Sequence, residues 1–118
     1  MKRNMELVRE LLLRVEAEQG FDSLTSKYSQ EEIVGHVEIL LDAKLLDGKV
    51  YHALSGGPGS AHIQRLTWAG HEFLDNARND TVWNKAISII KDKSVSVSFD
   101  VLASLLKSLV SSSLSWNG

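Results

Sequence analysis

Apolar residues recur at intervals of three and four along most of this chain, which is the spacing of amphipathic helices. The pattern is clearest from Ser29 to Leu46, where one apolar stripe consists of Ile33, Val37, Leu40 and Leu41. Ser29 and Glu32 have the spacing of a capping box, so we expect a helix to begin there. Lys44 falls in the last turn expected for this helix, where a cation interacts favourably with the helix dipole. Asp47-Gly48 is then expected to turn the chain into a hairpin.

Helical spacing also appears on both sides of this central segment. Residues Asn4 to Glu18 predict a first helix that Gly20 ends, and Phe21 to Tyr28 is too polar and short for more than a single turn. After the hairpin, Thr67 is expected to cap a helix that begins at Trp68. A polar break at residues 79–81 should then cap the next helix, which ends near Lys93. The chain is therefore expected to be mainly helical.

Two segments in the middle of the chain read as strands. Lys49 to Ser55 has side chains that alternate between two faces, Ala61 to Thr67 carries Ile63 and Leu66, and the glycine-rich stretch Gly56 to Ser60 separates the two segments. This pattern predicts a β-hairpin with a glycine-rich tip. The tip lacks the lysine and the following helix of a phosphate-binding loop, so we interpret it as a hairpin end.

Composition changes at Ser94, and from that residue onward the chain has nine serines and only two charged residues. Apolar residues still keep helical spacing, so we expect a C-terminal amphipathic helix over residues 94–118. It either folds back on the rest of the chain or forms a homodimer seam. The residues predicted for that seam are Leu102, Leu105, Leu106 and Leu109. A membrane-surface helix is less favoured, because the polar face lacks lysines and arginines.

Length and charge narrow the classes of function. At 118 residues the chain can bury one core, and the absence of cysteine removes disulfides and thiolate chemistry. No apolar run approaches the length of a membrane span, so we expect a cytoplasmic protein without a membrane partner. The net charge of −2 weighs against a simple electrostatic DNA binder without excluding a local basic patch.

The stretch SQEEIVGHVEILLDAKLLDG resembles the recognition-helix segment of winged-helix repressors, followed by a hairpin in the place of the wing. More of the chain is similar to a small, often prophage-encoded bacterial family called domain of unknown function twenty-five thirteen. That likeness rests on MKRNMELVRELLLRVE, YSQEEIVGHVEILLDAKLL and RLTWAGHEFLDNARNDTVWNKA. It implies a winged helix-turn-helix over residues 1–93 with extra C-terminal helices, and a phage or mobile-element setting. It implies no catalytic residues.

Two binding functions remain open. In the first, the chain is a DNA-binding transcriptional regulator, and the predicted contacts are Lys27, Gln30, Lys49 and Arg65. In the second, the acidic face of the central helix modulates a host or phage protein, and the predicted contacts are Glu31, Glu32 and Glu38.

Catalysis is not expected, and neither is a cofactor. His36, His52, His62 and His71 could meet as a metal site only if their elements converged with Glu72 or Asp75, and no spacing recommends this. We expect His36 to lie at the edge of the core with one backbone hydrogen bond. Trp68 and Trp83 are expected to pack in the core.

Overall fold

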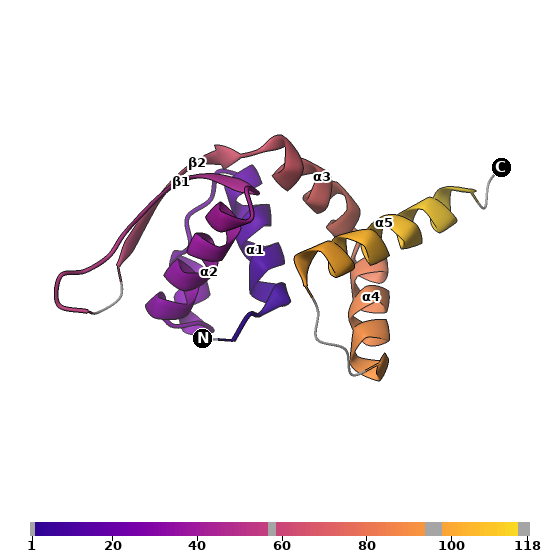
Figure 1. Cartoon of the computed structure of the whole chain (residues 1–118), viewed down its shortest axis with the longest axis horizontal. Helices are drawn as coiled ribbons and strands as arrows, with labels where there is room; N and C mark the ends of the chain where they lie inside the picture. The colour runs from indigo at the N-terminus through magenta and orange to yellow at the C-terminus, as the bar shows by residue number, and fades with distance from the viewer. Residues whose placement is uncertain (1, 57–58, 94–97, 116–118) are drawn as a thin grey trace. The chain divides into compact units, whose positions relative to one another are not determined.

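The computed structural model describes residues 2–56, 59–93 and 98–115 of the chain. Within them, five α-helices, one 3-10 helix and two strands follow one another (Figure 1). The elements are α1 (Met5–Glu16), η1 (Asp22–Ser26), α2 (Gln30–Asp42), β1 (Leu46–Tyr51), β2 (Ser60–Leu66), α3 (Trp68–Ala77), α4 (Asp80–Lys93) and α5 (Phe99–Ser115). The chain divides into two compact units, residues 1–71 and residues 72–118. The mainly helical class with a β-hairpin is confirmed.

The first helix packs its apolar face against α2 and β2. Its fully buried side chains are Leu7, Val8, Leu11 and Leu12. Asn4 caps the helix, since its Oδ1 accepts from the backbone N–H groups of Glu6 (3.0 Å) and Leu7 (3.3 Å). The helix ends at Glu16, four residues before Gly20, so the prediction that Gly20 ends it is wrong. Glu18 takes the left-handed conformation instead, with φ of 57°.

The capping box predicted for α2 is confirmed. Ser29 Oγ accepts from the Glu32 N–H, and Glu32 Oε1 accepts from the Ser29 N–H, both at 3.1 Å. The predicted end is wrong, because α2 stops at Asp42 and Lys44 adopts a φ of 65°. The N–H of Lys44 bonds to Leu41 O (3.1 Å) and that of Leu45 to Leu40 O (3.0 Å). This is a Schellman ending with lysine in the place that glycine usually takes.

The two strands form one antiparallel hairpin whose distal part extends beyond α1 and α2 (Figure 1). Asp47 and Gly48 lie inside β1, so the predicted turn at these residues is wrong. The strand starts early because the left-handed Lys44 has already redirected the chain. A register irregularity follows Asp47, and a Cβ on Gly48 would collide with the His62 carbonyl oxygen, so glycine permits this close crossing. The first strand ends at Tyr51, earlier than predicted, and a turn follows in which Gly56 N–H bonds to Ala53 O (3.1 Å).

Three helices carry the apolar side chains of the second unit. Asn79 caps α4 through its Oδ1, which accepts from the Val82 N–H (3.0 Å) as predicted. Phe73 and Phe99 meet edge to face with ring centroids 4.8 Å apart, and α5 packs on α4. The prediction that Trp83 is buried is confirmed. Trp68 is 78% exposed, so its predicted place in the core is wrong. The apolar spacing of α3 is carried by Phe73, Leu74 and Ala77 without it.

Candidate functional site

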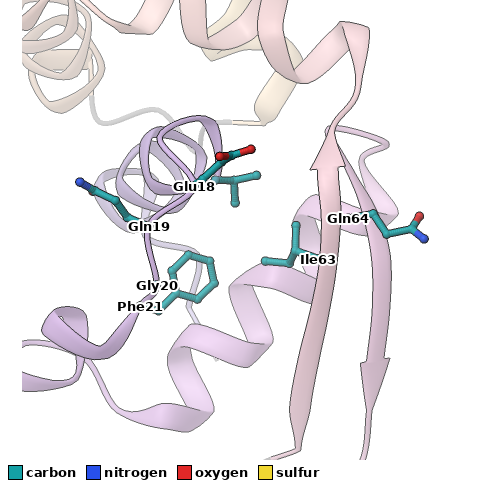
Figure 2. A pocket seen from close by; sticks show the side chains of 7 residues that line it. Glu18, Gln19, Gly20, Phe21, Ile63 and Gln64 are labelled. Atoms are coloured by element: carbon teal, nitrogen blue, oxygen red, sulfur yellow. The ribbon is translucent and has the colours of Figure 1, made fainter.

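One face of the hairpin presents polar and aromatic side chains to solvent. We call it the outer face, and its residues are Lys49, Tyr51, Ser60, His62 and Gln64, all exposed. The opposite face carries the half-buried side chains of Val50, Ala61 and Ile63. Figure 2 shows Ile63 and Gln64 directed to opposite sides of the hairpin, as strand alternation requires. The apolar side is held toward α1 and α2, which fixes the outer face in place.

The strand register brings the outer-face residues together across the hairpin. Lys49 lies opposite His62, and Tyr51 lies opposite Ser60. His62 is also the diagonal neighbour of Tyr51, at a Cα separation typically of roughly 7–8 Å. Lysine, imidazole and phenol side chains are therefore neighbours on one face of the hairpin, and Tyr51, opposite the small Ser60, is 57% exposed.

The two basic side chains on the hairpin strands, Lys49 and Arg65, differ in whether they have a carboxylate partner. Arg65 Nη2 lies 2.8 Å from Asp47 Oδ2, and Arg65 Nη1 donates to Leu66 O at 3.0 Å. The opposite charges of Arg65 and Asp47 offset each other, and both contacts of the Arg65 guanidinium are made within the chain. Among the residues that the structure describes, no carboxylate pairs with Lys49. The outer face therefore offers a lysine without a counter-charge.

The other predicted DNA contacts lie at the start of α2. Lys27 is exposed, with Nζ 5.5 Å from the centroid of the Tyr28 ring, and Gln30 is the exposed first residue of the helix. Gln30 lines a hollow of about 230 Å³ that also includes Phe21, Ile33 and Ala61. The structure thus places Lys49 and Arg65 on the hairpin and Lys27 and Gln30 beside the first turn of α2.

Two of the three carboxylates predicted for a protein contact already have partners within the chain. Glu32 closes the capping box, and Glu38 Oε2 lies 3.0 Å from His52 Nε2. Glu31 is exposed in the first turn of α2. The acidic surface that a partner can reach is therefore smaller than the sequence indicates.

His36 is fully buried and makes two hydrogen bonds, so the prediction of a core-edge histidine with one bond is wrong. Its Nε2 accepts from the Asn4 backbone N–H (2.8 Å), which leaves Nδ1 as the protonated nitrogen that donates to Glu32 O (2.8 Å). The side chain joins the cap of α1 to α2 and has a structural role. In the described part of the chain, no three His, Cys, Asp or Glu side chains are grouped to hold a metal ion.

A hollow of about 320 Å³ lies between the end of α1 and β2 (Figure 2). Its lining residues are Val15, Glu18, Gln19, Gly20, Phe21, Ile63 and Gln64. Figure 2 shows the side chains of Gln19 and Gln64 directed away from it, and its lining is mixed, with Val15, Phe21 and Ile63 beside the polar Glu18. It faces the side of the hairpin opposite the outer face.

The residues predicted for a homodimer seam divide into two pairs. Leu102 and Leu106 are fully buried within the chain, which removes them from a surface that a second copy could reach. Leu105 and Leu109 are half-buried, and Leu109 lines a hollow of about 390 Å³ together with Val82 and Lys85. Self-association through Leu105 and Leu109 stays a prediction. Residues 94–97 and 116–118 of the predicted C-terminal segment, and Gly57 and Pro58 of the hairpin tip, lie outside the described residues.

Comparison with known proteins gives two similarities. The model of a family described as "Hypothetical protein (DUF2513)" matches residues 2–96, a range that contains the whole hairpin. A protein of Haemophilus influenzae (strain ATCC 51907 / DSM 11121 / KW20 / Rd), described as an uncharacterized protein, is 36% identical over 126 residues. This alignment covers 97% of the present chain and 99% of the relative. No solved structure matches. Within residues 2–56, 59–93 and 98–115, no helix has the length and apolar character needed to cross a membrane.

Proposed function

Since the chain belongs to the DUF2513 family, we propose that it is a winged-helix protein that binds nucleic acid through the outer face of its hairpin. The order α1, η1, α2 and hairpin supports the winged-helix assignment, with η1 in the position of the second helix. In the phage or mobile-element setting that the family resemblance implies, such a protein acts as a regulator and not as an enzyme.

One observation carries this proposal. The outer face places Lys49 opposite His62 and beside the exposed Tyr51, and its one aspartate neighbour, Asp47, is neutralised by Arg65. A lysine without a counter-charge attracts a phosphate, and an exposed aromatic ring can contact a base. The start of α2 is not basic. Its first two residues are Gln30 and Glu31, and the carboxylate of the next residue, Glu32, is used in the capping box.

The geometry gives less support to the acidic protein contact. A partner that binds Glu31, Glu32 and Glu38 would compete with the capping box and with His52 for two of the three carboxylates. Such competition reduces the gain from each new ion pair, since an existing contact is lost. The hairpin requires no such exchange.

Reversing the charge of Lys49 tests the proposal. Lys49→Glu is expected to lower affinity for a labelled fragment of the gene's upstream DNA about tenfold at low salt, because one phosphate contact becomes a repulsion. The slope of log affinity against log salt should fall in magnitude by about 1. Fluorescence anisotropy across a salt series measures both quantities.

The matched control is Lys91→Glu, which makes the same charge change at an exposed position of α4. It should leave affinity nearly unchanged at moderate salt. Lys49 is a cleaner target than Arg65, whose replacement would also leave Asp47 without its partner. Equal affinities for the parent protein, Lys49→Glu and Lys91→Glu would reject the outer face as the interface.

A further inference from the structure

The outer face has few cations and one exposed aromatic ring, that of Tyr51. These two features indicate which kind of nucleic acid it can bind. Of the two basic side chains on β1 and β2, Arg65 is paired with Asp47, so Lys49 is the lysine or arginine left without a carboxylate there. Proteins that bind duplex DNA mainly by charge make many phosphate contacts, often roughly six to ten. A surface with so few must obtain its affinity from another source.

Tyr51 supplies that source. Tyr51 is 57% exposed, and its cross-strand neighbour Ser60 is too small to cover its ring. The imidazole of His62 lies on the diagonal from it, and Leu54, just beyond the end of β1, is fully exposed. Aromatic rings on a solvated strand face stack on unpaired bases, and every base offers a ring face for this contact. In a duplex the same ring faces are covered by neighbouring base pairs.

The adjoining surface of α2 also favours a single strand. Gln30 and Glu31 at its start and Asp42 at its end are exposed, and the exposed lysines nearest to it, Lys27 and Lys44, lie outside the helix itself. A wide duplex that reached both the hairpin and α2 would bring phosphates toward these carboxylates. A single strand can follow the two-stranded hairpin alone.

We infer that the outer face binds single-stranded nucleic acid, with Tyr51 stacking on an unpaired base, His62 beside it and Lys49 on a phosphate. This inference rests on the proposed function and specifies its ligand. Tyr51 is then a specificity-determining residue, because stacking distinguishes an unpaired base from a paired one. Lys49 contributes affinity to any nucleic acid.

The test uses the full chain and three labelled probes: a twelve-nucleotide oligothymidine, a mixed-sequence strand of equal length, and that strand annealed to its complement. Anisotropy at low salt should show both single strands bound at least tenfold more tightly than the duplex. Tyr51→Ala should weaken single-strand binding by roughly 5- to 150-fold, the range for loss of one stacked base. Tyr51→Phe keeps the ring and should stay within about twofold of the parent.

The possible outcomes separate this inference from the function on which it rests. Duplex binding that depends on Lys49 but not on Tyr51 would overturn the single-strand inference and leave the proposed function standing. Absence of binding to all three probes would overturn both. Circular dichroism of Tyr51→Ala confirms folding, which an exposed side chain should not disturb.

Discussion

Replacing Gly70 with alanine is expected to lower the free energy of unfolding of the first unit by about 3 kcal/mol, at the upper end of overpacking effects. Gly70 is buried in the first turn of α3, and a Cβ there would collide with the carbonyl oxygen of Leu45. It would also lie 3.2 Å from Leu66 Cδ2. A backbone carbonyl cannot rotate away as a flexible side chain can, so α3 must shift.

That shift would break the contacts that close the base of the hairpin. The Leu45 carbonyl accepts from Thr67 N–H (3.1 Å), and Thr67 Oγ1 donates to Lys44 O (2.6 Å). The same hydroxyl accepts from Gly70 N–H (3.0 Å) and so caps α3, as its sequence predicts. The glycine is thus a packing requirement, although in a helix it is usually unfavourable relative to alanine.

Gly20→Ala is the matched control, because in the described part of the chain no atom apart from those of its chain neighbours lies within 4 Å of the Cβ that it would add. Its expected effect on stability is small, roughly within 1 kcal/mol in either direction. Urea unfolding followed by circular dichroism measures both variants. If Gly70→Ala unfolds at the same urea concentration as Gly20→Ala, the close packing of α3 on Leu45 is incorrect.

His36→Phe should destabilise the first unit by roughly 1–3 kcal/mol, the range for leaving a buried polar group without its partner. Phenylalanine can fill most of the space, but it cannot accept from the Asn4 N–H or donate to Glu32 O. The loss falls at the cap of α1, so this end of the helix should open more often than the rest.

Hydrogen exchange gives the specific measurement for this variant. The Asn4 amide should lose protection in His36→Phe, whereas amides at the centre of α1 should change less. His71→Phe makes the same substitution at an exposed histidine of α3 and should change stability by no more than about 0.5 kcal/mol. Unchanged Asn4 exchange in His36→Phe would contradict the assigned hydrogen bond.

The elements that the sequence predicts best are those specified by neighbouring residues. The capping box of Ser29 and Glu32, the Thr67 cap and the Asn79 cap each involve residues three apart, and all are present. Predictions failed where the local structure depends on residues far away in the sequence. The start of β1 depends on a lysine in a left-handed conformation, a choice that its own side chain does not favour.

The candidate site was only partly predictable for the same reason. Lys49 can be identified from its charge, but its separation from any carboxylate depends on the pairing of Asp47 with Arg65 across the hairpin. That Tyr51 and His62 lie in two strands was visible in the sequence. Their adjacency was not, because it requires the strand register and the irregularity after Asp47. The capping contact of Glu32 was expected from its spacing to Ser29, whereas the pairing of Glu38 with His52 depends on the fold.

Binding of a single strand to the outer face can be mapped directly on the protein. A ¹⁵N-labelled sample of the full chain is titrated with the mixed-sequence single strand, and amide shifts are followed in ¹H–¹⁵N correlation spectra. Binding through the outer face predicts that the largest shifts occur at Lys49, Tyr51, His62 and Gln64, with little change from Gln30 to Glu38. Shifts concentrated at the start of α2, or an absence of shifts on the hairpin at saturating strand, would contradict it.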